Sequence, residues 1–212
     1  MRYLLLTSVL ALGVANSTMA RPISYPGGWT IMQMNNWESS TLHTHYSPNV
    51  KNSIGVAVEN YNESDRYNVN LQWNYLLGRK NTKDSQANLY LKTQAGVAFE
   101  GDEKEPNASI GIAGDWETRR YFVSYEAMGK YADELDDGSF HQKARVGVAP
   151  YVGEYGDIHT WIMLQAEHHP EEIDQDDQII FTPMIRMFKG DYLGEFGVNT
   201  NGDAMFNWVV RF

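Results

Sequence analysis

Two histidines near the start of the chain have the spacing of a metal-binding pair. His43 and His45 are separated by one residue, and side chains at positions i and i+2 share one face of a β-strand. Two imidazoles can hold a divalent or copper ion when a third ligand comes from a neighbouring strand. Met32 or Met34 could supply a soft ligand for Cu(I). The simpler interpretation is that both histidines are hydrogen-bonding side chains in a polar interior.

Other residues suggest enzymatic or calcium chemistry less strongly. Ser139 lies two positions before His141, so a nucleophile and a base could share one strand face, as a lipid-modifying enzyme would require. His168 and His169 are adjacent and should point to opposite faces of a strand, so they do not chelate together. The acidic runs 133–137 and 174–177 lack the spaced pattern of an EF-hand loop. They are interpreted as solvated loops that cations bridge to lipopolysaccharide.

The elements that would position these residues are β-strands. Alternation with a period of two runs through most of the chain, and residues 66–77 show it most clearly. There, one face carries large apolar side chains and the other carries amides and Arg66. The apolar face consists of Tyr67, Val69, Leu71, Trp73, Tyr75 and Leu77, and the polar face includes Asn68, Asn70, Gln72 and Asn74.

Composition excludes several classes of function. The 212 residues include no cysteine, which excludes disulfides and thiolate chemistry. The formal net charge of −10 argues against nucleic acid as a partner, because phosphate binding needs clustered cations. Residues 1–20 have the charge, the apolar run and the small-residue end of a signal peptide. We therefore expect an exported chain with one domain over residues 21–212.

Turn residues divide this domain into about twelve strands of the length that a tilted membrane strand needs. About ten strands is the alternative, if the segments 30–35 and 41–46 are not both in the sheet. With the N-terminus in the periplasm, the outward loops would be 100–106, 132–138 and 170–177, all long and acidic. A two-residue turn at Gly190 and Asp191 would place Arg186 opposite Glu195.

Alternation alone allows either a soluble calyx with its apolar face inside or a membrane barrel with that face in lipid. The polar face is rich in ions, which favours the membrane barrel. The charged residues expected to line its lumen are Arg66, Lys92, Glu126, Lys143, Arg145, Glu167, Arg186, Glu195 and Arg211. Tyrosine and tryptophan at the ends of the apolar face are typical of aromatic girdles at the bilayer interfaces.

The last strand carries a further signal. Apolar residues alternate towards a terminal aromatic residue, at Phe206, Trp208, Val210 and Phe212. In these features the chain resembles the bacterial outer-membrane β-barrel class, whose last strand is read by the barrel-assembly machinery. The resemblance implies an all-β, transmembrane, antiparallel up-and-down barrel in the outer membrane, with lipid and lipopolysaccharide around it. It implies no particular activity.

Three functions are compatible with such a barrel. The leading expectation is a narrow channel or small-solute conduit, because small residues on the polar face leave some room inside. The alternatives are a metal-binding or metal-responsive barrel that uses His43 and His45, and a lipid-modifying enzyme that uses His141. The mixed charges could also pair into a plug that closes the lumen. The small residues in question are Gly111, Ala113, Gly147, Ala149 and Gly197.

Overall fold

The computed structural model describes residues 23, 25–62, 64–132, 136–154, 156–170 and 179–212, and the predicted signal peptide lies outside them. Among the described residues, no helix is long and apolar enough to cross a membrane. The strands are β1 (Trp29–Asn35), β2 (Ser39–Asn49), β3 (Asn52–Tyr61), β4 (Arg66–Asn81), β5 (Ser85–Glu100), β6 (Glu103–Thr118), β7 (Tyr121–Ala132), β8 (Asp136–Val148), β9 (His159–His168), β10 (Ile179–Lys189), β11 (Tyr192–Val198) and β12 (Ala204–Arg211).

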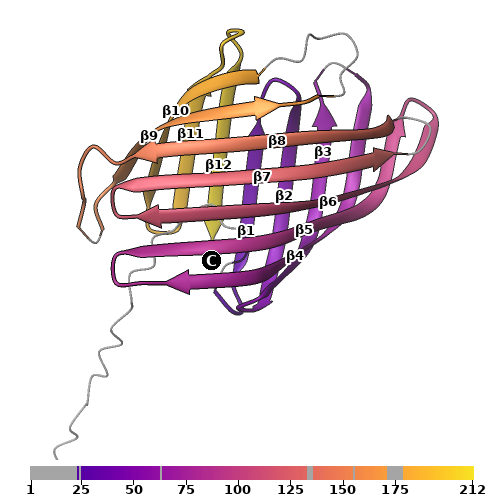
Figure 1. Ribbon diagram of the computed structural model, residues 1–212. Coiled ribbons are helices and arrows are strands. Elements are labelled where there is room, and N and C mark those ends of the chain that lie inside the picture. Colours follow the sequence, from indigo (N-terminus) through magenta and orange to yellow (C-terminus); the bar gives the residue numbers. More distant parts are fainter. Residues whose placement is uncertain (1–22, 24, 63, 133–135, 155, 171–178) are drawn as a thin grey trace, which may run out of the picture.

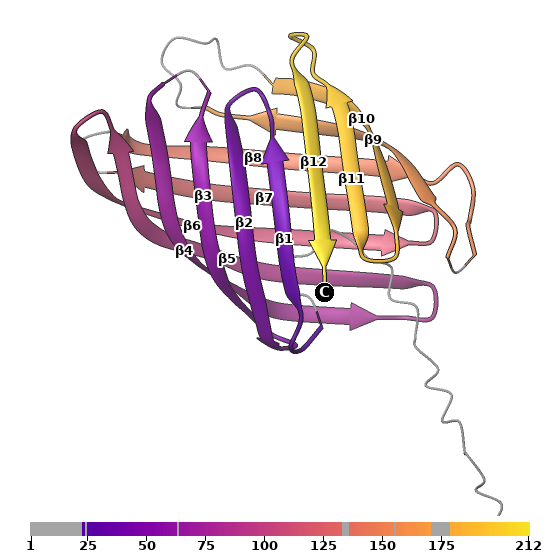
Figure 2. The ribbon, with the colours of Figure 1, turned by 180° about the vertical axis from the view of Figure 1, so that it is seen from behind.

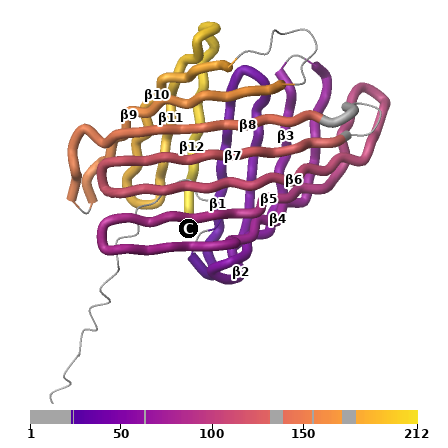
Figure 3. Tube along the Cα trace, viewed as in Figure 1, coloured from indigo at the N-terminus to yellow at the C-terminus, as the bar shows by residue number. Residues whose placement is uncertain are grey.

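These strands form one closed antiparallel barrel. Each strand pairs with its neighbours in sequence, and β1 pairs with β12, so the chain meanders around the barrel (Figure 3). The prediction of an up-and-down barrel of twelve strands is confirmed. The ten-strand alternative is wrong, because Thr30 of β1 pairs both with His45 of β2 and with Arg211 of β12. Closure gives every strand two neighbours, which suits a bilayer because lipid does not tolerate an open sheet edge.

The strands differ in length and direction around the barrel. Strands β4, β5 and β6 have 16 residues each, more than the roughly 9–11 that a tilted membrane strand needs. In Figures 1 and 2 the wall formed by β4 to β8 runs across the wall formed by β1 to β3, β11 and β12. Within the first wall, β4 and β5 approach closely at Gly96, since a Cβ atom there would lie 2.0 Å from the carbonyl oxygen of Val69.

Burial alternates along the strands as the sequence predicts. In β4, Asn68, Asn70 and Gln72 are buried while Leu71 and Trp73 are exposed. The polar face therefore lines the interior of the barrel and the apolar face forms its outer surface. Aromatic side chains are exposed at the end of the barrel that holds the chain terminus, here called the terminus end. They include Trp29, Tyr46, Trp116, Tyr121 and Tyr192.

The predicted register at one hairpin is confirmed. Gly190 and Asp191 form the turn between β10 and β11, and Arg186 lies opposite Glu195. Gly190 has a φ of 57°, a left-handed conformation that glycine adopts without steric cost. The tight turn therefore aligns the two strands and brings the opposite charges together.

One predicted outer loop is wrong. The segment 100–106 belongs mostly to strands, because β5 continues to Glu100 and β6 begins at Glu103. Only Gly101 and Asp102 form the turn, and charged residues continue the alternation because these long strands extend past the length that lipid requires. The other predicted loops, 132–138 and 170–177, lie partly outside the described residues. The connection 149–158 between β8 and β9 is long, although it lies at the terminus end.

Candidate functional site

The interior of the barrel holds the charged residues that the sequence singles out. All of them lie on the inner side of their strands, buried or half-buried. They are Arg66, Lys92, Glu126, Lys143, Arg145, Glu167, Arg186, Glu195 and Arg211. Because the strands alternate strictly, each inner residue of one strand meets inner residues of its neighbours. As a result, most of these charges lie in clusters that contain both positive and negative side chains.

The first cluster surrounds Glu195 of β11. The carboxylate accepts hydrogen bonds from Nε of Arg186 at 2.6 Å and from Nδ2 of Asn207 at 2.8 Å. Nη1 of Arg145 lies 3.4 Å from both of its oxygens. Side chains of Glu195 and Arg186 are each 3% exposed. Buried charges are tolerated only when they are paired and hydrogen-bonded, so this cluster fastens β8, β10, β11 and β12 together inside the barrel.

The second cluster surrounds Glu126 of β7 and remains in contact with solvent. Nζ of Lys92 lies 2.6 Å and Nζ of Lys143 lies 3.6 Å from the carboxylate. Nε2 of His141 lies 3.9 Å from the same group. The four side chains are 17–22% exposed. Water therefore reaches this part of the interior, in contrast to the cluster around Glu195.

The third cluster lies towards the opposite end of the barrel from the termini, here called the loop end. Nζ of Lys130 lies 3.3 Å from Glu59 and 3.8 Å from Glu38. The hydroxyl of Tyr61 donates to Glu59 at 3.3 Å. The guanidinium of Arg66 lies over the Tyr61 ring, 4.9 Å from its centroid. A cation above a ring face is attracted by the ring electrons, so Tyr61 is held between ions on the inner wall.

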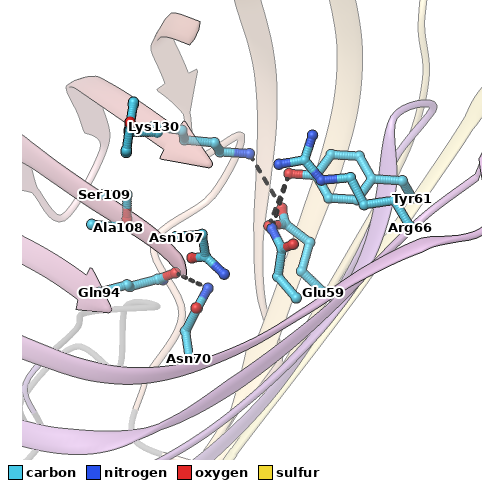
Figure 4. A pocket seen from close by; sticks show the side chains of 11 residues that line it. Glu59, Tyr61, Arg66, Asn70, Gln94, Asn107, Ala108, Ser109 and Lys130 are labelled. Atoms are coloured by element: carbon cyan, nitrogen blue, oxygen red, sulfur yellow. Dashed lines mark hydrogen bonds and ion pairs between the residues drawn. The ribbon is translucent and has the colours of Figure 1, made fainter. Parts of the chain in front are cut away.

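These residues border a small polar pocket, which Figure 4 shows from close by. Asn70 of β4 and Gln94 of β5 lie on one side, where Nδ2 of Asn70 donates to Gln94 at 3.2 Å. Asn107 and Ser109 of β6 lie next to them. Lys130 reaches across from β7 to Glu59. This pocket was not predicted from the sequence, although the sequence does show the run of inward amides in β4.

An apolar cluster fills the interior near the terminus end. It was not predicted from the sequence. Phe122 and Trp161 pack edge to face with ring centroids 6.2 Å apart, and the guanidinium of Arg186 lies 5.0 Å from the Phe122 centroid. The sequence contains one sign of this cluster, because several strands carry large apolar residues on their otherwise polar face. Its members are Phe122, Ala149, Trp161, Met163, Met184, Phe188, Leu193, Met205 and Val209.

The histidine pair shares the inner face of β2. Nδ1 of His43 lies 2.8 Å from Oε1 of Gln72, and His45 is only 1% exposed. Met32 lies opposite His43 across the β1–β2 pair. Within the described residues, no group of three or more His, Cys, Asp or Glu side chains could hold a metal ion. This finding does not cover methionine ligands, so a site formed by His43, His45 and a methionine stays a prediction.

The other candidate histidines take part in ring and polar contacts. His141 stacks on His169 with ring centroids 5.6 Å apart, and it also faces Glu126. His168 points the other way, where its Nδ1 lies 2.9 Å from Nε2 of Gln142. The partners found for His141 are thus an ion cluster and a second imidazole. Such surroundings offer no special support for a catalytic pair with Ser139.

Comparisons with known proteins bear on the fold. No family model matches the sequence, and no curated protein matches it. Among solved structures, the chain is similar to the KdgM porin in complex with disordered oligogalacturonate, with a TM-score of 0.52 and 8% identity over 87% of this chain and 98% of that chain. A structure of the KdgM porin alone gives a TM-score of 0.51 and 7% identity, with the same coverage.

The TM-scores show a shared fold, and identities this low show nothing beyond the fold. The fold is that of an outer-membrane β-barrel, closed by twelve antiparallel strands. The apolar outer surface is in keeping with this fold, because exposed leucine, isoleucine and valine along nearly every strand require lipid rather than water. The soluble calyx is therefore wrong, since its apolar face would have to lie inside.

Proposed function

We propose that this protein is a narrow channel or conduit for small solutes in the outer membrane. The observation that carries the proposal is the part of the interior around Glu126, where the charged side chains remain 17–22% exposed. A solvated row of fixed charges of both signs provides a path for small polar solutes. Similarity to a porin fold is compatible with this proposal, but at such low identity it does not indicate which solute would pass.

The path we propose runs along the β3 to β8 side of the interior. Inward amides and small residues line this side, and Gly111 of β6 is among them. The other side is closed near the terminus end by the apolar cluster around Trp161. A barrel of about twelve strands encloses little space once its inward side chains are counted. Conductance should therefore be small, and passage should be limited to solutes of low mass.

The test is single-channel recording in planar bilayers with the refolded mature chain. We expect discrete small current steps, and we expect Glu126→Gln to shift the reversal potential in a salt gradient towards anions, because the solvated cations Lys92 and Lys143 then lack their counter-charge. Glu103→Gln is the matched control, since Glu103 is exposed near the β5–β6 turn. A folded, inserted barrel that carries no current would refute the channel and leave the paired charges as a plug.

Assembly partners belong to the same proposal. The alternating apolar residues that end at Phe212 would be read by the barrel-assembly machinery, and the acidic loops would bind lipopolysaccharide through bridging cations. Phe206, Trp208 and Phe212 point outward on β12 or directly after it, and Phe212 is 59% exposed.

A further inference from the structure

The turn between β1 and β2 contacts the opposite wall of the barrel at the loop end. The ring of Trp37 packs edge to face with the ring of His169, directly after β9, and the ring centroids are 5.4 Å apart. Glu38 lies 3.8 Å from Nζ of Lys130 on β7. Strands β10 to β12 separate β9 from β1, and strands β3 to β6 separate β2 from β7. Both contacts therefore cross the mouth of the barrel, and the end of β9 lies beside this turn in Figures 1 and 2.

Residues 36–38, here called the strap, are held in place by Asn62, which follows β3. Nδ2 of Asn62 donates to the carbonyl oxygen of Asn36 at 2.9 Å and to that of Trp37 at 3.0 Å. The backbone N–H of Asn62 donates to the carbonyl oxygen of Glu38 at 2.9 Å. All three carbonyls of the strap are thus hydrogen-bonded, so the turn keeps one direction and presents its side chains to the far wall.

The partners of the strap on the far wall are themselves anchored. His169 stacks on the ring of His141 on β8, with centroids 5.6 Å apart and ring planes 17° from parallel. Lys130 also lies 3.3 Å from Glu59 on β3. One row of rings and one row of charges therefore span the mouth of the barrel.

The strap lies where an entering solute has to pass. Beside Lys130, the side chains of β3 to β7 leave only the small polar pocket of Figure 4. A barrel of about twelve strands encloses little space once its inward side chains are counted. An indole ring and an ion pair in the mouth therefore remove a large share of the passage.

The contacts of the strap are individually weak. Glu38 and Lys130 are 21% and 19% exposed, and ion pairs that remain in contact with solvent contribute little to stability. The barrel itself is closed by backbone pairing between its strands. The barrel can therefore stay folded when the strap loses its contacts, and local opening of this kind is typical of loops that control access.

We infer that the strap sets the size limit and the conductance of the conduit, and that Trp37 and Glu38 are the residues that narrow its entrance. The inference deepens the proposed function and rests on it. It places one restriction at the loop end, apart from the apolar cluster that fills the interior near the terminus end.

The test compares single-channel conductance and the swelling of proteoliposomes in glucose and in sucrose, with refolded mature chains. Trp37→Ala/Glu38→Gln removes the ring and the charge, so it should raise the conductance about twofold and speed swelling in sucrose relative to glucose. The matched control is Trp29→Ala/Glu103→Gln, which should behave as wild type. Trp29 is exposed on the outer surface, where its ring lies 5.3 Å from that of Tyr46, and Glu103 is exposed near the β5–β6 turn.

Further variants test the anchor on the far wall. His169→Phe keeps a ring opposite Trp37 and should conduct as wild type does, whereas His169→Ala should conduct more. Because the chain has no cysteine, Trp37→Cys/His169→Cys can be joined by a short reagent that forms reducible bonds. The joined barrel should conduct less than the same barrel after reduction. This comparison uses a single folded preparation, so it does not depend on the stability of one variant relative to another.

The inference is overturned if Trp37→Ala/Glu38→Gln conducts as wild type does, if the control variant conducts as much as this variant, or if the two cysteines cannot be joined. Current steps from wild type would remain in each of these cases, so the channel would stand without the strap. Folded, inserted barrels that carry no current in wild type or in any variant would overturn the channel and the strap together.

Discussion

The buried carboxylate of Glu195 should be among the most costly side chains to alter in this barrel. Its side chain is 3% exposed, and it accepts hydrogen bonds from Arg186 and Asn207 and lies within 3.4 Å of Arg145. Glu195→Gln keeps the shape but removes the charged carboxylate that Arg186 and Arg145 share inside the barrel. Breaking a buried pair by removing one partner costs about 3–5 kcal/mol, and we expect a loss in this range.

The measurement is equilibrium unfolding in urea of the refolded barrel in lipid vesicles, followed by tryptophan fluorescence and by the electrophoretic mobility of the folded form. The control is Glu103→Gln, which removes an exposed carboxylate and should change the free energy of unfolding by less than about 0.5 kcal/mol. Replacing Arg186 with methionine in the Glu195→Gln background should recover part of the loss, because one buried charge is then removed. A loss below about 1 kcal/mol for Glu195→Gln would refute the reasoning.

Three further changes test other parts of the structure. Trp161→Ala removes a ring from the apolar cluster, so it should increase single-channel conductance and lower the free energy of unfolding by about 3–5 kcal/mol; unchanged conductance would mean that this cluster does not limit passage. Gly96→Ala should destabilise the barrel in urea, because its Cβ would lie 2.0 Å from the carbonyl oxygen of Val69, and wild-type stability would show that β5 adjusts freely. Phe212→Ala should slow assembly into membranes that contain the barrel-assembly machinery, whereas Phe196→Ala, which removes another outward ring (55% exposed) and controls for lost contact with lipid, should not. An unchanged assembly rate would argue against recognition of this residue.

The paired charges inside the barrel have two separate consequences. Around Glu195 they are sealed from solvent together with the aromatic rings of Phe122 and Trp161, so they serve to hold one side of the barrel closed. Around Glu126 they stay hydrated, so they can act on passing solutes. One barrel therefore contains a filled side and a solvated side, and the proposed path for solutes follows the solvated side.

Much of this architecture could be predicted from the sequence, because a strand has a period of two. Alternation along residues 66–77 separates an apolar face from an amide face without any knowledge of the fold. The same local rule put Arg186 opposite Glu195 across a two-residue turn. The prediction was wrong at residues 100–106, where the charged residues indicated a loop but the strands continue. Strands that extend beyond lipid can carry charge and still pair.

The sequence by itself determined the class of the protein, the inner and outer faces of its strands and the pairing of neighbouring strands, since these depend on alternation and on local turns. Only the tertiary structure decided which inner residues meet between strands that are not joined by a short turn. Lys130 reaches Glu59 from a strand 71 residues away in sequence, and Phe122 packs against Trp161. Contacts across a lumen depend on the curvature and stagger of the closed sheet. No periodicity within a single strand encodes these distances.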